Sequence, residues 1–403
     1  MELVKTDIIP AKPYFIGEKK TEDYEAICFF AATGFFLDQD SYFKEQKVLK
    51  PAHHYQIEEG VIQSAKPYFK WHYSPIERPF EQVVQEFAAL FETITDEQVG
   101  DKKVILALSG GLDSRTQAAA LHYLKKDVQS YSYEFENGFN ETYFAKKIAQ
   151  VCQFPLQKWI IPKGYLWKNM EEIATINQCY SEFTHPRQAA VLDKLSNLGE
   201  VFSLGHWGDV LFDDMGVDDQ LPFDEQVDLM AKKVLKKGCL FLEKKLWKSW
   251  NLEGDFESYV KQRITVLLQE INIPTSANAQ IRAFKSLYWA PRWTSVNLAY
   301  FEKVAPLTLP YYDNRMCEFI CTVPEKYLAG RQIQIAYLKM RNPALAKIAW
   351  QDARPFNLYN YHWNKEPWNY PYRAYQKFKN EFLTKNKVAN NYENQFMGEQ
   401  NDQ

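Results

Sequence analysis

The chain has 403 residues, of which 46% are hydrophobic and 25% charged, and its formal net charge is −3. This length accommodates two domains with a sizeable core, while the small net charge gives no electrostatic basis for binding nucleic acid. Residues 1–7 lack the charged-then-apolar pattern of a signal peptide, the longest apolar run (residues 26–37) is too short to span a bilayer, and the six cysteines are scattered. We therefore expect a cytoplasmic protein with reduced thiols and with neither a membrane nor a nucleic acid as its partner.

The N-terminal part is expected to form a small α+β domain over residues 1–75. Two prolines within residues 74–79 mark a linker after it. An amphipathic helix is predicted over residues 80–97, because apolar side chains recur there on one stripe. From this helix a larger domain is expected to extend over residues 80–363, with a helical C-terminal part, followed by a polar tail over residues 364–403.

Four β-like runs alternate with helical segments in the larger domain; they cover residues 104–108, 129–135, 156–161 and 201–204. One intervening helix is predicted over residues 114–126 and another over residues 140–149, with Asn140 as its N-cap. This alternation is typical of an α/β fold, a parallel sheet with right-handed crossovers and helices on both faces. Ligands of such sheets bind beyond the carboxyl ends of the strands.

A glycine-containing loop, Ser-Gly-Gly-Leu-Asp-Ser, joins the first of these strands to its helix. Gly110 and Gly111 allow the backbone to approach an anion closely, and the amides at the helix start favour negative charge. The hydroxyls of Ser109 and Ser114 add donors, and Asp113 offers a carboxylate suited to Mg²⁺. The loop is neither a Walker A loop, which ends in Gly-Lys-Ser/Thr, nor a dinucleotide fingerprint, which needs a third glycine. It predicts a phosphate-binding loop of another kind.

A second motif, Gly-His-Trp-Gly-Asp, follows the strand at residues 201–204. One carboxylate rarely holds Mg²⁺, whereas two carboxylates with phosphate oxygens commonly do, so Asp113 and Asp209 are the predicted metal pair. His206 is suited to accept a proton from an amine near neutral pH, or it packs on Trp207 as an ordinary loop histidine.

Together these motifs resemble the synthetase domain of the asparagine synthetase family, within the N-type ATP pyrophosphatases (adenine nucleotide alpha hydrolase-like fold), over roughly residues 80–350. The glycine loop resembles the pyrophosphate loop, the second motif stands where the family has Gly-Glu-Gly-x-Asp-Glu, and residues 310–315 resemble its Pro-Phe-Leu-Asp-x-Arg. In this last segment Asp313 is also expected to cap a helix. The resemblance implies cleavage of ATP between its α and β phosphates, with Ser132 and Gly205 beside the glycine loop as further nucleotide contacts.

Three departures from the family accompany this resemblance. Residues 32–55 resemble the closing half of its glutaminase domain, but Glu2 stands where the family has a nucleophilic cysteine, so no glutamine hydrolysis is expected. His206 replaces the glutamate of the second motif. The lysine that the family carries shortly after Gly330 is missing; Arg331 and Lys339 are the nearest cations, and Lys339 is taken as its replacement beside His206 in catalysis.

The resemblance implies an ATP-dependent, amide-forming ligase that adenylates a small-molecule, peptide or glycan carboxylate and transfers it to ammonia or an amine. One alternative is a degenerate member that binds nucleotide without turnover. Another is a different N-type pyrophosphatase, such as a tRNA-thiolating enzyme or a GMP-forming amidotransferase. Residues 185–187, with Arg187, are candidates for the acceptor pocket, and residues 356–372 for either a lid or a C-terminal arm.

Overall fold

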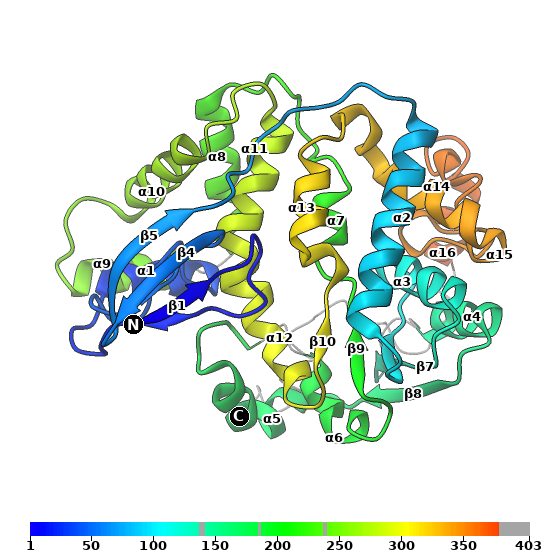
Figure 1. Ribbon diagram of the computed structural model, residues 1–403, viewed down its shortest axis with the longest axis horizontal. Coiled ribbons are helices and arrows are strands. Elements are labelled where there is room, and N and C mark those ends of the chain that lie inside the picture. Colours follow the sequence, from blue (N-terminus) through cyan, green and yellow to red (C-terminus); the bar gives the residue numbers. More distant parts are fainter. Residues whose placement is uncertain (137–141, 184–186, 237–239, 379–403) are drawn as a thin grey trace.

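The computed structural model describes residues 1–136, 142–183, 187–236 and 240–378. Its larger part is built on a five-stranded sheet in the order β10-β9-β6-β7-β8, in which every pair of neighbours is parallel (Figure 1). The strands are β6 (Val104–Ala107), β7 (Val128–Phe135), β8 (Leu156–Ile161), β9 (Val201–Ser203) and β10 (Leu307–Thr308). The predicted α/β fold is confirmed, and the four predicted strands lie within one residue of their expected ends. The fifth, β10, has only two residues and was not predicted.

The order of the strands reverses at β6, and this reversal positions the site. The chain moves from β6 to β8 through α3 (Leu112–Tyr123) and α4 (Thr142–Cys152), and then returns through α5 (Tyr165–Asn177) and α6 (Leu192–Leu195) to β9, on the other side of β6. Right-handed crossovers place the two pairs of helices on opposite faces of the sheet. A crevice is expected where the strand order reverses, between β6 and β9. Asn140, the predicted cap of α4, lies outside the described residues.

Further helices surround this sheet. The predicted amphipathic helix is α2, whose buried stripe includes Phe87 and Phe91. Between α11 and α12 the chain forms a ten-residue π-helix, η2, which contains Pro291, a residue with no backbone N–H to donate. Stretches of π-helix often mark functional sites. The bounds are α2 (Phe80–Val99), α7 (Gly208–Leu211), α8 (Phe223–Val234), α9 (Leu240–Ser249), α10 (Phe256–Ile271), α11 (Ala277–Phe284), η2 (Lys285–Thr294), α12 (Ser295–Glu302) and α13 (Asn314–Ile320).

The N-terminal part contains two small antiparallel sheets, β1-β4-β5 and β2-β3, and one helix. Buried Phe29 and Phe35 of this part belong to the same hydrophobic cluster as Phe87 and Phe91 of α2. The linker predicted at residues 74–79 is therefore a change in chain path, not a break in packing (Figure 1). The bounds are β1 (Glu2–Lys5), β2 (Phe15–Ile16), α1 (Tyr24–Thr33), β3 (Lys47–Val48), β4 (His53–Glu58) and β5 (Val61–Pro67).

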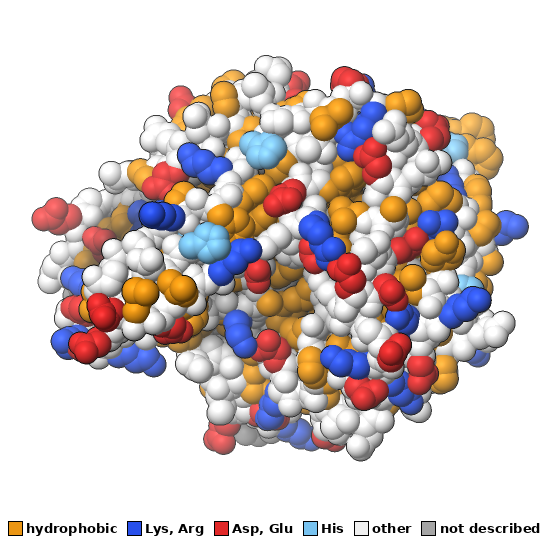
Figure 2. All heavy atoms as spheres, viewed as in Figure 1, with side chains coloured by type: hydrophobic (Ala, Val, Ile, Leu, Met, Phe, Trp, Pro, Cys, Tyr) orange, Lys and Arg blue, Asp and Glu red, His pale blue; other side chains and the backbone are white. Residues whose placement is uncertain are grey.

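The C-terminal part is helical up to residue 363, as expected, and its helices α14 and α15 pack beside α2, α3 and α4 (Figure 1). Helix α16 lies within the segment that was expected to be a polar tail. Acidic and basic side chains are interspersed over the face drawn in Figure 2, in keeping with the small net charge. Within the described residues, no helix is both long and apolar enough to cross a membrane. The bounds are α14 (Gln332–Arg341), α15 (Pro343–Ala346) and α16 (Tyr370–Phe378), and the short 3-10 turns are η1 (Arg187–Val191), η3 (Pro310–Tyr312), η4 (Glu325–Tyr327), η5 (Ala329–Arg331), η6 (Gln351–Ala353) and η7 (Tyr361–Trp363).

Candidate functional site

A cavity of about 590 Å³ lies at the carboxyl ends of β6, β7 and β9, where the strand order reverses. Its size falls within the usual range for small-molecule sites. The structure brings most of the predicted site residues into its wall, from three separate strand ends. These are Ser109, Asp113, Ser114, Ser132, Gly205, His206 and Asp209.

The glycine loop is held closed by its own hydroxyls. The Ser109 N–H donates to Ser114 Oγ over 3.1 Å, the two hydroxyl oxygens lie 3.0 Å apart, and the Gly111 N–H donates to Ser109 Oγ over 3.3 Å. Helix α3 starts directly after Gly111, without a side-chain cap. Its first amides and its dipole are thereby left for an anion in the cavity.

The C-terminal part braces this loop from behind. A Cβ on Gly110 would lie 2.3 Å from Gln351 Oε1 and 2.7 Å from Gln351 Cβ, so the close approach requires glycine. The fully buried guanidinium of Arg115 donates to the carbonyls of Gly110 (3.3 Å), Ile348 (3.0 Å) and Ala349 (3.0 Å). Arg115 therefore fixes the glycine loop together with residues 345–351, which form a strap behind it.

Close packing also requires both glycines of the second motif, because each of them lies against Asp113. A Cβ on Gly205 would lie 2.9 Å from Asp113 Cβ, and one on Gly208 would lie 2.4 Å from Asp113 Oδ1 and 2.7 Å from the Tyr311 ring. The loop after β9 can approach the start of α3 this closely only with glycine at these positions. Its next residue, Asp209, is exposed and lines the cavity.

Asp113 is the electrostatic centre of the site. Its Oδ1 accepts hydrogen bonds from Arg331, in an ion pair, and from Gln334 Nε2 over 3.2 Å. Gln334 also donates to the Tyr311 hydroxyl over 2.7 Å. Burial raises the pKa of the Asp113 carboxyl, the nearby Asp209 carboxylate adds to this effect, and Arg331 opposes it.

The carboxylates fit a divalent cation. Within the described part of the chain, Asp113 Oδ2 and both Asp209 oxygens have no hydrogen-bond partner, although both side chains line the cavity. The two carboxylates repel each other, and a cation bound between them would offset this repulsion. Mg²⁺ prefers such oxygen ligands. No group of three or more His, Cys, Asp or Glu side chains that could hold a metal occurs among the described residues. Phosphate oxygens would therefore supply the remaining ligands.

The structure places Lys339 away from the cavity in which its predicted catalytic role would be exerted. Lys339 does not line the cavity, and its ammonium lies 5.1 Å from the centre of the Tyr359 ring. It stands five residues beyond Gln334 on α14, which at about 3.6 residues per turn places it on another face of the helix. The cation that this segment brings to the site is Arg331, whose backbone is left-handed (φ 61°).

Two further segments singled out in the sequence, residues 310–315 and residues 356–372, contribute no side chain to the cavity wall. Asp313 caps α13 as expected, accepting the Arg315 N–H over 3.0 Å, but neither residue lines the cavity. None of residues 356–372 lines it either; this segment begins at the strap behind the loop, where the Trp350 N–H donates to the Phe356 carbonyl over 2.8 Å. That position is in keeping with the C-terminal arm, one of the two expected roles.

The cavity also contains side chains that sequence reasoning missed. Lys285, Trp289 and Trp293 project into its wall from the π-helix η2. No motif surrounds them in the sequence, and only the π-helix and its proline distinguish this segment. Arg187 lines the cavity as expected, with its guanidinium 5.5 Å from the centre of the Phe135 ring. Residues 185 and 186, named with it, lie outside the described residues.

The chain is similar to known proteins over part of its length. The family model described as asparagine synthase matches residues 86–192, which run from α2 through the glycine loop to the start of α6. The predicted resemblance is confirmed for this segment. A glutamine-hydrolyzing GMP synthase from Ehrlichia chaffeensis is 36% identical over 94 residues, which are 23% of this chain and 18% of that protein. One from Ehrlichia canis is 40% identical over 80 residues, 19% of this chain and 15% of that protein.

The chain thus spans less than a fifth of the length of these curated relatives. Two solved structures are also similar. One is an NMN synthetase from Francisella tularensis, with 14% identity and a TM-score of 0.26 over 51% of this chain and 92% of that one. The other is a glutamine-dependent NAD+ synthetase from Acinetobacter baumannii in complex with adenosine diphosphate, with 15% identity and a TM-score of 0.25 over 61% of this chain and 53% of that one. Such scores describe too little shared geometry to assign any residue here.

Proposed function

We propose that this protein is an ATP-dependent, amide-forming ligase. A carboxylate attacks the α phosphorus of ATP, pyrophosphate leaves, and ammonia or an amine then displaces AMP from the acyl-adenylate. The observation that carries this proposal is the convergence of the glycine loop, Asp113 and Asp209 on one cavity. The asparagine synthase match over residues 86–192 includes that loop and supports the same chemistry.

Five side chains of the cavity wall have a physical role in this reaction, together with the start of α3. The amides at the start of α3, with Ser109 and Ser114, bind the phosphates of ATP. Asp113 and Asp209 would hold Mg²⁺, which when bound neutralises phosphate charge. His206 accepts the proton of the attacking amine, since imidazole changes charge near neutral pH.

The amine is proposed to come from solution and not from glutamine hydrolysed in the same chain. Glu2 lies on strand β1 and is exposed, and it accepts a hydrogen bond from the Tyr14 hydroxyl over 3.2 Å. Cys28, the first cysteine, is buried in α1, where burial raises the pKa of its thiol to about 12. Neither residue offers a thiolate nucleophile. A small-molecule, peptide or glycan carboxylate as acceptor and a cytoplasmic location complete the proposal.

Pyrophosphate release from Mg²⁺ and ATP, measured with a panel of carboxylates and with or without ammonium, tests this function. We expect release that depends on a carboxylate and falls at least a hundredfold in Asp113→Asn and Asp209→Asn, while exposed Asp101→Asn keeps the wild-type rate. Binding of ATP without pyrophosphate release for any acceptor would instead identify a nucleotide-binding protein without turnover. Absence of ATP binding would contradict the proposal altogether.

A further inference from the structure

Lys285 is a cavity-lining cation to which neither the motifs nor the family match gives a role. It is the first residue of η2, is only partly buried, and shares the cavity wall with Asp209 and the glycine loop. Its ammonium lies 6.0 Å from the centre of the Trp207 ring. Within the described ranges, it makes no hydrogen bond and no ion pair closer than 4 Å, so its charge is directed to the cavity.

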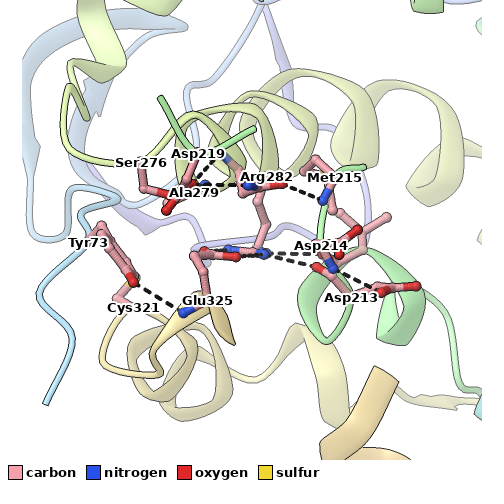
Figure 3. A network of polar contacts seen from close by, with 12 residues as sticks. Tyr73, Asp213, Asp214, Met215, Asp219, Ser276, Ala279, Arg282, Cys321 and Glu325 are labelled. Carbon is pink, nitrogen blue, oxygen red and sulfur yellow. Dashed lines mark hydrogen bonds and ion pairs between the residues drawn. The ribbon is translucent and has the colours of Figure 1, made fainter. Parts of the chain in front are cut away.

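The backbone at Lys285 is fixed by three hydrogen bonds that join η2 and the end of α11 to the segment after β9. The Trp207 indole N–H donates to Ser286 Oγ over 3.0 Å, between buried side chains. One turn earlier, Arg282 donates to the Val210 carbonyl over 3.2 Å and to the Asp213 carbonyl over 2.9 Å (Figure 3). The start of η2 is therefore attached to the loop that carries Asp209.

Arg282 is itself held by a buried partner. Its guanidinium pairs with the Glu325 carboxylate through two hydrogen bonds, of 2.5 and 2.8 Å, and Figure 3 shows it lying between Glu325 and the backbone at Asp213. The Glu325 N–H in turn donates to the Tyr73 hydroxyl over 3.1 Å. Arg282 and Ser286 thus fix the backbone from which the Lys285 side chain extends to the cavity wall.

The other cations of the site are placed differently. Arg331 is occupied by Asp113 and Gln334, and Lys339 lies outside the cavity wall. Among the described residues, the cations that line the cavity are Lys285 and Arg187, and Arg187 enters from η1 with its guanidinium over the Phe135 ring. Lys285 lies between Arg282 and Ser286, two residues that contact the segment carrying Asp209.

We propose that Lys285 binds the phosphate chain of ATP opposite the glycine loop and stabilises the charge of the departing pyrophosphate. This assignment rests on the proposed function. The acceptor carboxylate oxygen forms a bond to the α phosphorus, the bond from that phosphorus to the α,β-bridging oxygen breaks, and its electron pair leaves with pyrophosphate. Lys285 stays protonated throughout, so the step transfers no proton. A lysine that serves only as counter-ion to Asp209 is the competing account.

Calorimetric binding of inorganic pyrophosphate and of adenosine, each with Mg²⁺, separates these accounts in the full chain. We expect Lys285→Gln to weaken pyrophosphate binding at least tenfold without changing adenosine affinity, and to slow pyrophosphate release by about 10²–10³-fold. Lys285→Arg should recover part of both losses. Exposed Lys146→Gln on α4 is the matched control and should behave as wild type. Lys285→Met, which keeps the apolar stem, replaces the glutamine variant if that variant does not fold.

The outcomes are distinguishable from failure of the proposed function. Wild-type pyrophosphate affinity and release rate in Lys285→Gln would overturn the role of Lys285 and leave the ligase intact. Equal losses of pyrophosphate and adenosine binding would also overturn it, since they indicate a structural role. If wild-type protein binds neither ATP nor pyrophosphate, the proposed function fails, and the assignment of Lys285 fails with it.

Discussion

Arg331 pairs with Asp113, and this contact joins a residue with a left-handed backbone to the first turn of the helix behind the phosphate loop. A non-glycine residue with φ of 61° is uncommon, and such conformations persist where the surroundings hold them. Here the hold comes from Asp113 and from Gln334, whose Oε1 accepts the Arg331 Nε–H over 2.7 Å. The segment after Gly330 therefore contributes a charge that favours the ionised form of the Asp113 carboxyl.

Removing this charge should weaken both folding and nucleotide binding. Arg331→Gln leaves the Asp113 carboxylate beside Asp209 without its cation, so we expect a loss of about 1–3 kcal/mol in the free energy of unfolding. Urea denaturation measures it. Arg373→Gln, which removes an exposed pair with Glu366 at 3.8 Å, is the control and should change stability by less than about 0.5 kcal/mol. Equal losses of unfolding free energy in the two variants would show that the buried ion pair stabilises the protein no more than the exposed one.

Adjacent glycines of the phosphate loop should respond differently to alanine. Gly110→Ala forces a Cβ against Gln351, at 2.3 Å from its Oε1, whereas a Cβ on Gly111 meets only Ser109 Oγ, at 3.4 Å. We expect Gly110→Ala to destabilise the protein by about 1–3 kcal/mol through overpacking, as measured by thermal unfolding. Gly111→Ala should stay within about 0.5 kcal/mol of wild type. The reverse order would mean that the strap does not press on the loop.

Arg115 should be essential to the loop although it lines no part of the cavity. Arg115→Met keeps much of the volume but leaves the carbonyls of Ile348 and Ala349 without their donor, while the Gly110 carbonyl keeps only the Gln351 N–H, at 3.4 Å. Unpaired buried carbonyls cost about 1–3 kcal/mol each, so we expect a loss of several kcal/mol, and protease cleavage of the residues after α15 at lower temperature. Arg115→Lys should restore only part of this stability, because an ammonium cannot reach both sides of the strap. Wild-type protease resistance in Arg115→Met would contradict the bracing role.

The Arg282–Glu325 pair should show strong coupling in a double-mutant cycle. Glu325→Gln leaves the Arg282 charge buried without its partner, and we expect it to destabilise the protein by about 3–5 kcal/mol. Arg282→Met with Glu325→Leu should cost less than the sum of the single variants, since no unpaired charge remains. Additive losses in chemical denaturation would show that the two side chains act independently.

How much the sequence could predict depended on where each group lies along the chain. The strands and the loop from Ser109 to Ser114 were predictable because glycines, hydroxyls and β-like runs lie next to one another. The pairing of Asp113 with Asp209 followed from the rule that strand ends share one edge of a sheet. Lys285 could not be predicted, because it reaches the cavity from a helix without a motif. The choice of Lys339 over Arg331 depended on which face of α14 points inward, which two close cations in a sequence do not reveal.

Phosphorus-31 NMR of the nucleotide products tests the central claim most directly. Purified protein with Mg²⁺, ATP, ammonium and an accepted carboxylate should yield AMP and pyrophosphate in equal amounts, and Asp113→Asn should yield neither above background. ADP and inorganic phosphate as the products would contradict cleavage between the α and β phosphates, and with it the role assigned to the glycine loop and its two carboxylates.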